Sequence, residues 1–462
     1  MGKARLSEHS KWMLFILLVS FILRLYLVLQ GGPHYWPDES RFEVSRSAAN
    51  FLFSGDLKSA YAALDSADHF LFKVVGVVPA ALEKAISTDL EIPALFFALF
   101  SVFNVWLIWR ISLRLGSGES EALLSAFLLA LASSFFYYSR HLLPYDASMT
   151  FGLLSLLVAV RTPTRKRDSC FCALLSSACF LTYNGYWTLA AFTMVVHVTW
   201  ARPGTSEMIS RAWRSAVCFW APPLAVVTAS SLFGGDLLDQ FIWFSNSVTQ
   251  GEFSEGATLP IAYLWHTEHF LLLVWVLAFG FSMWAMIKGA STARSTMGVA
   301  GILFIYGFMV LTSVGLNKFV VYGRLVRQLV PFFCLLTAYQ LQHLRGVHGG
   351  IRRAFPILCT MLVLQAAFNF RVPLQQVFPS DFVRKANKTA EALEGGRTAN
   401  LLFAHHLYPV PEDPRLPPHT ILLQERHPIQ FLPNQYEGYT PEERSALRSM
   451  DISMRLFVLD QE

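Results

Sequence analysis

Long apolar runs recur along most of the chain and limit its possible folds more than any other feature. Each is about 20 residues long, the length that an α-helix needs to cross ~30 Å of hydrocarbon. Because 54% of the 462 residues are hydrophobic and only 15% are charged, the composition is not that of a soluble globular protein. The sequence therefore predicts an all-α polytopic membrane bundle of about 11 helices, at residues 12–30, 93–113, 120–138, 145–161, 169–183, 187–200, 214–233, 269–288, 298–316, 325–343 and 353–370.

Positive residues orient these predicted helices. Lysines and arginines precede the first run and follow the second, fourth, sixth, eighth and tenth runs, and such an excess marks cytoplasmic loops. The segment 234–268 has several acids and neither Lys nor Arg, so we expect it on the other side. No small-residue cleavage site follows the first run, which indicates a retained span. We expect a multi-pass protein of the cell inner membrane with a cytoplasmic N-terminus and an extracytoplasmic C-terminus.

Charge and cysteine usage argue against other classes of protein. The formal net charge of +5 is explained by the loop residues that orient the helices, so it does not indicate a nucleic-acid partner. The six cysteines lie in or beside apolar runs, and none forms a CxxC pair. The sequence therefore predicts neither a disulfide framework nor a cysteine metal site.

Four segments share the outer face in this topology, namely 31–92, 139–145, 234–268 and the region from about residue 371. The first of them is too long for a simple connector. Its portions Arg41–Phe53 and Val74–Ser87 have helical apolar spacing, which suits helices that lie in the membrane interface.

The chain beyond the last apolar run has a different pattern. We expect a charged helix at Asp381–Leu393 and a second helix from Thr440, where proline follows as the first helical residue. Strand-like runs are found at 399–404, 420–423 and 455–459. We therefore divide the chain into a transmembrane domain, 1–370, and a small α/β extracytoplasmic domain, 371–462.

A pair of carboxylates, Asp38 and Glu39, follows the first apolar run. Pro33 and Pro37 prevent the helix from continuing, so both acids come at the membrane surface. Placing a carboxylate there costs free energy unless it is solvated, forms an ion pair or has a functional role. One interpretation is a functional site; the other is a solvated helix start with Asp38 as N-cap.

Cations occur at several predicted outer helix ends. Arg324 and Arg327 are three residues apart and can share one helix face, which suits a phosphate on a membrane-anchored molecule. The alternative is that they extend to lipid headgroups. Lys73 is either a surface lysine or a phosphate contact. Arg140 has either a structural role or a contact with the donor phosphate.

Other polar residues come at the same helix ends. Asp146 is either a second catalytic acid or an N-cap. His266 and His269 flank Glu268 with a spacing that fits packing or a divalent cation, and no motif requires another cofactor. We place five further residues in a pocket for acceptor and sugar: Arg41, Tyr138, Tyr183, Asn184 and Tyr322. Acids and cations together suit inverting sugar transfer, in which a carboxylate deprotonates the acceptor hydroxyl and cations stabilise the departing phosphate.

The sequence resembles the polyprenyl-phosphate-sugar-dependent glycosyltransferases of the GT-C class, which include protein O-mannosyltransferases and lipid A aminoarabinose transferases. The resemblance covers roughly residues 10–345 and rests on four motifs: Pro37-Asp38-Glu39-Ser40-Arg41-Phe42 with Gly55-Asp56 after it, Tyr138-Ser139-Arg140 with Pro144-Tyr145-Asp146, Tyr183-Asn184-Gly185, and Arg324 with Arg327 and Pro331.

The resemblance implies a helical bundle with a large outward cavity, in which Asp38 matches the proposed catalytic acid and Asp146 a second acid. Lys73 and Arg324 would contact the phosphate. The sequence departs from the aminoarabinose transferases at Phe72, where they have a metal-binding glutamate. It also lacks the Trp-Trp-Asp-Tyr-Gly signature of oligosaccharyltransferases, which argues against asparagine glycosylation.

We therefore expect a membrane glycosyltransferase that moves a hexosyl or pentosyl group from a polyprenyl-phosphate donor. Its partners would be that donor, a lipid, glycan or protein acceptor, and membrane lipids. A lipid-linked glycan ligase or polymerase is a second interpretation. A transporter or flippase is a third. It should place ionisable groups near mid-span and show repeat symmetry, whereas the charges here lie mainly at outer helix ends and no such symmetry stands out. A scaffold role for the outer domain is compatible with each of them.

Overall fold

The computed structural model describes most of the membrane domain and part of the C-terminal region. The described residues are 8–29, 41–66, 68–86, 91–139, 141–161, 165–247, 257–316, 323–346, 356, 360–365, 367, 400–404, 420–425 and 454–459. Predictions for Asp38, Glu39, Arg140 and Tyr322 lie outside these residues, and so do the helices expected in the C-terminal region.

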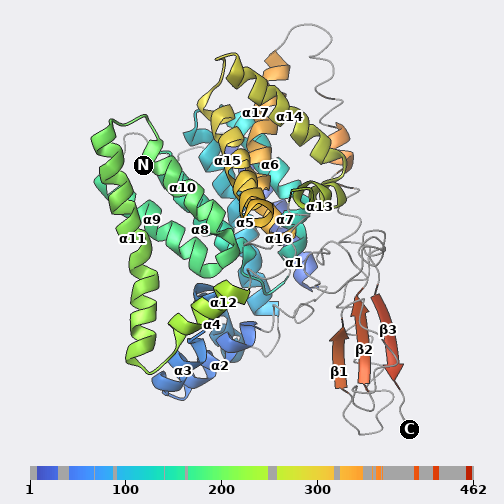
Figure 1. Cartoon of the computed structure of the whole chain (residues 1–462). Coiled ribbons are helices and arrows are strands. Elements are labelled where there is room, and N and C mark those ends of the chain that lie inside the picture. Colours follow the sequence, from blue (N-terminus) through green and yellow to red (C-terminus); the bar gives the residue numbers. More distant parts are fainter. Residues whose placement is uncertain are drawn as a thin grey trace, which may run out of the picture.

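Ten of the predicted apolar runs correspond to helices (Figure 1). These are α1 (Glu8–Leu29), α5 (Glu91–Arg114), α6 (Glu119–Leu131) with α7 (Ser133–Tyr138), α8 (Tyr145–Ala159), α9 (Lys166–Thr182), α10 (Trp187–Thr199), α11 (Thr205–Leu232), α14 (Phe270–Ile287), α15 (Ala293–Val310) and α17 (Val330–Gly346). In the described part of the chain, α1, α5, α11, α14 and α15 are long and apolar enough to cross a membrane. The eleventh run is described only in part.

Short helices interrupt or extend several runs. The third run breaks at Ala132, where α7 begins beside a buried carboxylate from another helix. The ninth run ends in η3 (Leu311–Gly315), and the tenth starts with α16 (Gly323–Val326) and η4 (Arg327–Leu329). Helix α11 begins at Thr205, before the predicted run, so its basic first turns continue the helix rather than form a loop. Because long cationic side chains extend readily to the interface, such turns remain compatible with a membrane helix.

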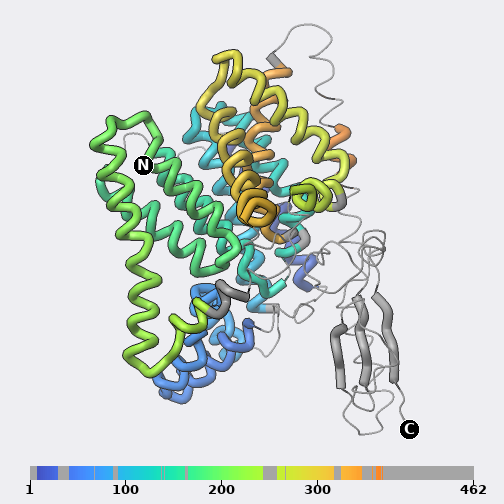
Figure 2. Tube along the Cα trace, in the orientation of Figure 1, coloured from blue at the N-terminus to red at the C-terminus, as the bar shows by residue number. Residues whose placement is uncertain are grey.

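The described residues of the first outer loop form three helices. Helix α2 (Arg41–Phe53) covers the predicted residues, α4 (Phe70–Ile86) starts slightly earlier than predicted, and α3 (Leu57–Leu64) was not predicted. Phe72 and Phe42 pack on Phe97 of α5, with ring centroids 4.8 and 6.1 Å apart. This packing docks the loop helices on one end of the bundle, where Figure 2 shows them in blue.

The loops of that end also contact one another. Ser230 at the end of α11 donates a 3.0 Å hydrogen bond to Asp65, which follows α3. Gln240 of α12 (Leu237–Ser247) donates to the Asp65 carbonyl, and Glu268 at the end of α13 (Leu259–Glu268) bonds α7. We call this end of the bundle, formed by α2–α4, α7, α12, α13, α16 and the start of α8, the loop end.

Glycines let two helices of the bundle approach closely. A Cβ on Gly301 of α15 would lie 2.4 Å from the Phe332 ring, and one on Gly298 would lie 2.5 Å from Leu336. Both neighbours belong to α17. Small residues at such crossings are a usual means of packing membrane helices, so α15 and α17 are held at a fixed distance next to the segment that carries Arg324 and Arg327.

The three predicted strands are present and form one sheet in the order β1-β2-β3. Strand β1 (Asn400–Ala404) pairs in parallel with β2 (Thr420–Glu425), and β2 pairs antiparallel with β3 (Met454–Leu459). The α/β character of this domain stays a prediction, because its expected helices are outside the described residues.

Candidate active site

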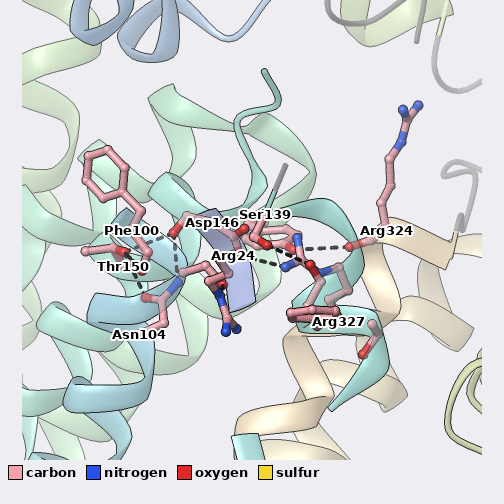
Figure 3. A network of polar contacts seen from close by, with 12 residues as sticks. Arg24, Phe100, Asn104, Ser139, Asp146, Thr150, Arg324 and Arg327 are labelled. Carbon is pink, nitrogen blue, oxygen red and sulfur yellow. Dashed lines mark hydrogen bonds and ion pairs between the residues drawn. The ribbon is translucent and has the colours of Figure 1, made fainter. Parts of the chain in front are cut away.

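An ion pair between Asp146 and Arg327 lies in the interior of the bundle (Figure 3). Arg327 Nη2 donates a 2.6 Å hydrogen bond to Asp146 Oδ1. Arg327 has no exposed surface and the Asp146 side chain is 6% exposed. Because removing one partner of a buried pair leaves an uncompensated charge, such pairs cost about 3–5 kcal/mol to break. This pair therefore fixes η4 against the first turn of α8.

Backbone and amide contacts hold both members of the pair. Asn104 Nδ2 of α5 donates to the Asp146 carbonyl at 3.0 Å, and Thr150 donates to Asn104 Oδ1 at 2.8 Å. Next to Arg327, Gln328 accepts from the Thr188 hydroxyl and the Leu189 amide at 2.8 and 3.1 Å. Each side of the pair is thus tied to a second helix, which restricts the positions that both charges can take.

Aromatic rings surround the guanidinium groups. The Arg327 guanidinium lies 4.7 Å from the ring centroids of both Phe135 and Tyr138 on α7. Arg324 Nη1 donates a 2.8 Å hydrogen bond to the Tyr145 hydroxyl. Cation–π contacts of this kind strengthen when they are desolvated, so α7 and Tyr145 provide a cradle for the two arginines.

A chain of rings connects this region to the first outer loop. The Tyr145 ring lies 4.9 Å from that of Tyr183, and Tyr183 lies 4.9 Å from the His69 ring. His69 precedes α4, adopts φ 52° and accepts the backbone hydrogen bond of Lys73 at 3.2 Å. Predicted site residues from distant parts of the sequence are therefore linked by direct contact.

Lys73 and Arg41 converge on one carboxylate, that of Asp68. Lys73 Nζ donates to Asp68 Oδ1 at 2.9 Å and to the Ser66 carbonyl at 3.0 Å, and Arg41 Nε donates to Asp68 Oδ2 at 2.5 Å. Burial raises the pKa of Asp68, but Lys73, the Ser66 hydroxyl and Arg41 together bring it well below its usual range. Burial lowers the pKa of Lys73, and Asp68 opposes this change. The cluster holds two cations and one anion.

Tyr183, Asn184 and Gly185 form the turn between α9 and α10. Asn184 begins η2 (Asn184–Tyr186), and its Oδ1 is buried with no hydrogen-bond partner among the described residues. A Cβ on Gly185 would lie 2.5 Å from Leu325 and 2.7 Å from the Tyr183 ring. Glycine is therefore needed for this turn to pack under α16.

The histidines near α14 do not gather a metal-ligand set in the described part of the chain. No group of three or more His, Cys, Asp or Glu side chains suited to a metal occurs there. His266 lies on α13, and His269 ends that helix with φ 48°. Glu268 accepts instead from the Ser133 and Ser134 amides at 3.0 and 2.8 Å. Its carboxylate thus caps α7, the helix that packs on Arg327.

The loop end therefore brings together most of the described candidates. Direct contacts join Asp146, Arg324, Arg327, Tyr138, Tyr183, Lys73 and Arg41 into one region. Two participants, Arg24 and Asp68, were missed in the sequence, and Glu268 was noted there only as a neighbour of the histidines. Arg24 could have been found, because it is a charge within the first apolar run, and Asp68 because it precedes Lys73 in a loop of small polar residues.

The fold is similar to that of solved membrane enzymes. ArnT from Cupriavidus metallidurans, solved bound to undecaprenyl phosphate, is 13% identical, with a TM-score of 0.52 over 81% of this chain and 74% of that one. The archaeal oligosaccharyltransferase AglB from Archaeoglobus fulgidus, in complex with an inhibitory peptide and a dolichol-phosphate, is 10% identical, with a TM-score of 0.48 over 86% of this chain. The chain spans only 63% of the length of AglB.

No protein-family model matches the sequence, and no curated protein does so either. The likeness to ArnT shows the fold, which is the GT-C fold that the motifs predicted. Together with the apolar helices, this fold makes the chain an integral membrane protein.

Proposed function

We propose that the protein transfers one sugar, with inversion, from a polyprenyl-phosphate donor to an acceptor hydroxyl at the loop end. The observation that carries this proposal is the contact chain from Arg324 through Tyr145, Tyr183 and His69 to the Lys73 cluster. It joins two cationic groups at one end of a bundle with the fold of ArnT, whose solved structure holds undecaprenyl phosphate. The loop end would then be extracytoplasmic and the N-terminus cytoplasmic.

In the proposed reaction, the acceptor oxygen attacks the anomeric carbon from the face opposite the phosphate. The bond between the anomeric carbon and the phosphate oxygen breaks, and the phosphate keeps the electron pair. Asp38, with Glu39 beside it, takes the proton of the acceptor hydroxyl as general base. Arg324 and Lys73 stabilise the charge that develops on the departing phosphate. Asp146 holds Arg327 in place through their ion pair.

Tyr138, Tyr183, Asn184, Arg41 and Tyr322 would line the pocket for sugar and acceptor. Asn184 Oδ1 is buried and has no hydrogen-bond partner among the described residues, which supports this assignment, since an acceptor atom at such a place can bind a sugar hydroxyl. Arg140 would be a further phosphate contact. A ligase or polymerase of lipid-linked glycans would use the same donor chemistry and differ in the size of its acceptor.

The test is a transfer assay with the purified full-length protein. It would be incubated with a panel of radiolabelled polyprenyl-phosphate sugars and membrane extract, half of the samples containing chelator. The Asp38→Asn variant should lose transfer yet still bind undecaprenyl phosphate. Asp239→Asn, an exposed acid on α12, is the matched control and should keep full activity. Retained transfer in Asp38→Asn would remove Asp38 from the role of base, and loss on chelation would point to a divalent cation.

A further inference from the structure

Arg24 is a charged residue inside the first membrane helix, and the proposed reaction has not used it. It lies in α1, a helix long and apolar enough to cross a membrane, and it has no exposed surface. A charged side chain within a membrane span is costly and usually marks a function. The cost also rises because no carboxylate among the described residues bonds it directly.

Hydroxyl groups are the partners of Arg24. Its Nε donates to Ser101 Oγ of α5 at 2.9 Å, and its Nη1 donates to Ser20 Oγ and the Ser20 carbonyl at 2.6 and 3.2 Å. The guanidinium lies 5.5 Å from the Phe136 ring of α7. In the described part of the chain Nη2 has no hydrogen-bond partner. These contacts fix α1 to α5 without a direct ion pair to the guanidinium among the described residues.

The charge of Arg24 interacts with the buried ion pair. Arg24 is attracted by Asp146 and repelled by Arg327, and Figure 3 shows all three in one network. Ser101 and Asn104 are three residues apart on α5 and so share one face of that helix. Ser101 accepts from Arg24 of α1, and Asn104 donates to the Asp146 carbonyl of α8. One turn of α5 therefore sets the positions of both α1 and α8.

We propose that Arg24 is a positioning residue for the transfer reaction, an inference that rests on the proposed function. It docks α1 on α5 at the level of Asp146, and it adds a fixed positive charge beside the Asp146–Arg327 pair. Helix α1 is also the helix from which the chain continues to Asp38 and Glu39. Because a small misplacement of a catalytic group lowers the rate more than it changes binding, Arg24 acts on the rate of transfer.

Four variants test this role in the full-length protein. Arg24→Met removes the charge and the hydrogen bonds, Arg24→Lys keeps the charge, and Ser101→Ala removes a single acceptor. Arg110→Met is the matched control, since Arg110 is exposed on α5 and contacts only Trp106 and Trp109 among described rings. For each variant we would measure thermal unfolding, backbone hydrogen exchange, and kcat and KM for the donor. We would also compare the binding of undecaprenyl phosphate with the binding of undecaprenol.

The expected result is a fall in kcat of about tenfold for Arg24→Met, equivalent to a loss of about 1.4 kcal/mol in transition-state positioning, with donor KM unchanged. Arg24→Lys should recover part of this loss, and Ser101→Ala should show a smaller one. Faster exchange should be confined to α1 and α5. A purely structural role predicts lower thermal stability with normal kcat per folded molecule, and that outcome would overturn the proposal.

Failure of the proposed function looks different. If the wild-type protein neither binds undecaprenyl phosphate nor transfers any sugar of the panel, the transfer reaction is excluded, and hydrogen exchange alone decides whether Arg24 docks α1. If Arg24→Met does not fold, Arg24→Lys and Ser101→Ala still test the positioning role. Wild-type kcat and wild-type exchange in both would refute the positioning role.

Discussion

Asp146 Oδ1 accepts a 2.6 Å hydrogen bond from Arg327 Nη2, although the two residues are 181 positions apart in the sequence. The bond joins α8 to the short η4 turn, and rings of α7 cover it. Around it lie Arg24 on α1 and Arg324 on α16, so helices from the first and last thirds of the bundle meet at one polar centre. In the described residues this centre therefore groups three arginines around one carboxylate.

Breaking the central pair should destabilise the protein. Arg327→Met or Asp146→Asn leaves one buried charge without its partner, for which we expect a loss of about 3–5 kcal/mol in unfolding free energy. The double variant should be less unstable than the sum of the two single changes, because the orphaned charge is gone. Thermal unfolding in detergent measures this double-mutant cycle. Additive losses would show that the two side chains do not interact.

Arg324 should matter for phosphate rather than for stability. Its side chain is only partly buried, and its described hydrogen bond goes to the Tyr145 hydroxyl. A hydrogen bond to a charged group contributes about 1.5–3 kcal/mol, so Arg324→Met should weaken binding of undecaprenyl phosphate by more than about tenfold. Undecaprenol, which lacks the phosphate, should bind both proteins alike. Equal weakening of undecaprenol would assign the effect to the hydrocarbon chain instead.

Asp68 should make stability depend on acid pH. Its folded pKa lies below the value of an unfolded Asp, about 3.9, because Lys73, Ser66 and Arg41 outweigh the effect of burial. A lowered folded pKa stabilises the protein above the unfolded pKa, and this stabilisation is lost as pH falls toward the folded pKa. The difference in unfolding temperature between wild type and Asp68→Asn should therefore be constant near neutral pH and shrink below about pH 4. A difference independent of pH would contradict this account. Asp239→Asn, at an exposed acid on α12, is the control for nonspecific acid effects.

The sequence predicts the helices of this bundle better than it predicts the site. Apolar run length is a local property, and the runs at 93–113, 145–161 and 169–183 became α5, α8 and α9 with small shifts at their ends. The break of the third run at Ala132 was not predictable, since it depends on Glu268 from a helix far along the chain.

Candidate residues were found by their position at helix ends, but their partners were not. A phosphate contact by Lys73 stays a prediction, and its bond to Asp68 depends on how the loop before α4 closes. The His69–Tyr183 contact joins α4 to the turn after α9, and no local pattern encodes it. Pairings of this kind are set by tertiary packing. A single sequence therefore identifies the charged residues but does not show which of them form ion pairs.

Glu268 should support the site through α7. Its carboxylate accepts from the amides of Ser133 and Ser134 and from the Ser134 hydroxyl at 2.6 Å, so it serves as a cap supplied by another helix. Losing a cap costs about 0.5–2 kcal/mol. Glu268→Ala should lower the unfolding free energy by about this amount, whereas Glu268→Gln, which keeps an acceptor oxygen, should lose less. Thermal unfolding checks both, and identical losses would mean that the charge alone matters.

Gly185 should be intolerant of even one added methyl group. A Cβ there would meet the Leu325 side chain at 2.5 Å and the Tyr183 ring at 2.7 Å, so Gly185→Ala must move at least one of these side chains. Overpacking of this kind costs about 1–3 kcal/mol, and it should also weaken binding of undecaprenyl phosphate because both neighbours adjoin Arg324 and Tyr145.

Gly280→Ala in α14 is the matched control. No atom lies within 4 Å of its added Cβ, so it should be neutral or stabilising by up to about 1 kcal/mol. Adding Leu325→Ala to Gly185→Ala relieves the nearer contact and should recover part of the lost stability; no recovery would show that the strain lies against the tyrosine ring.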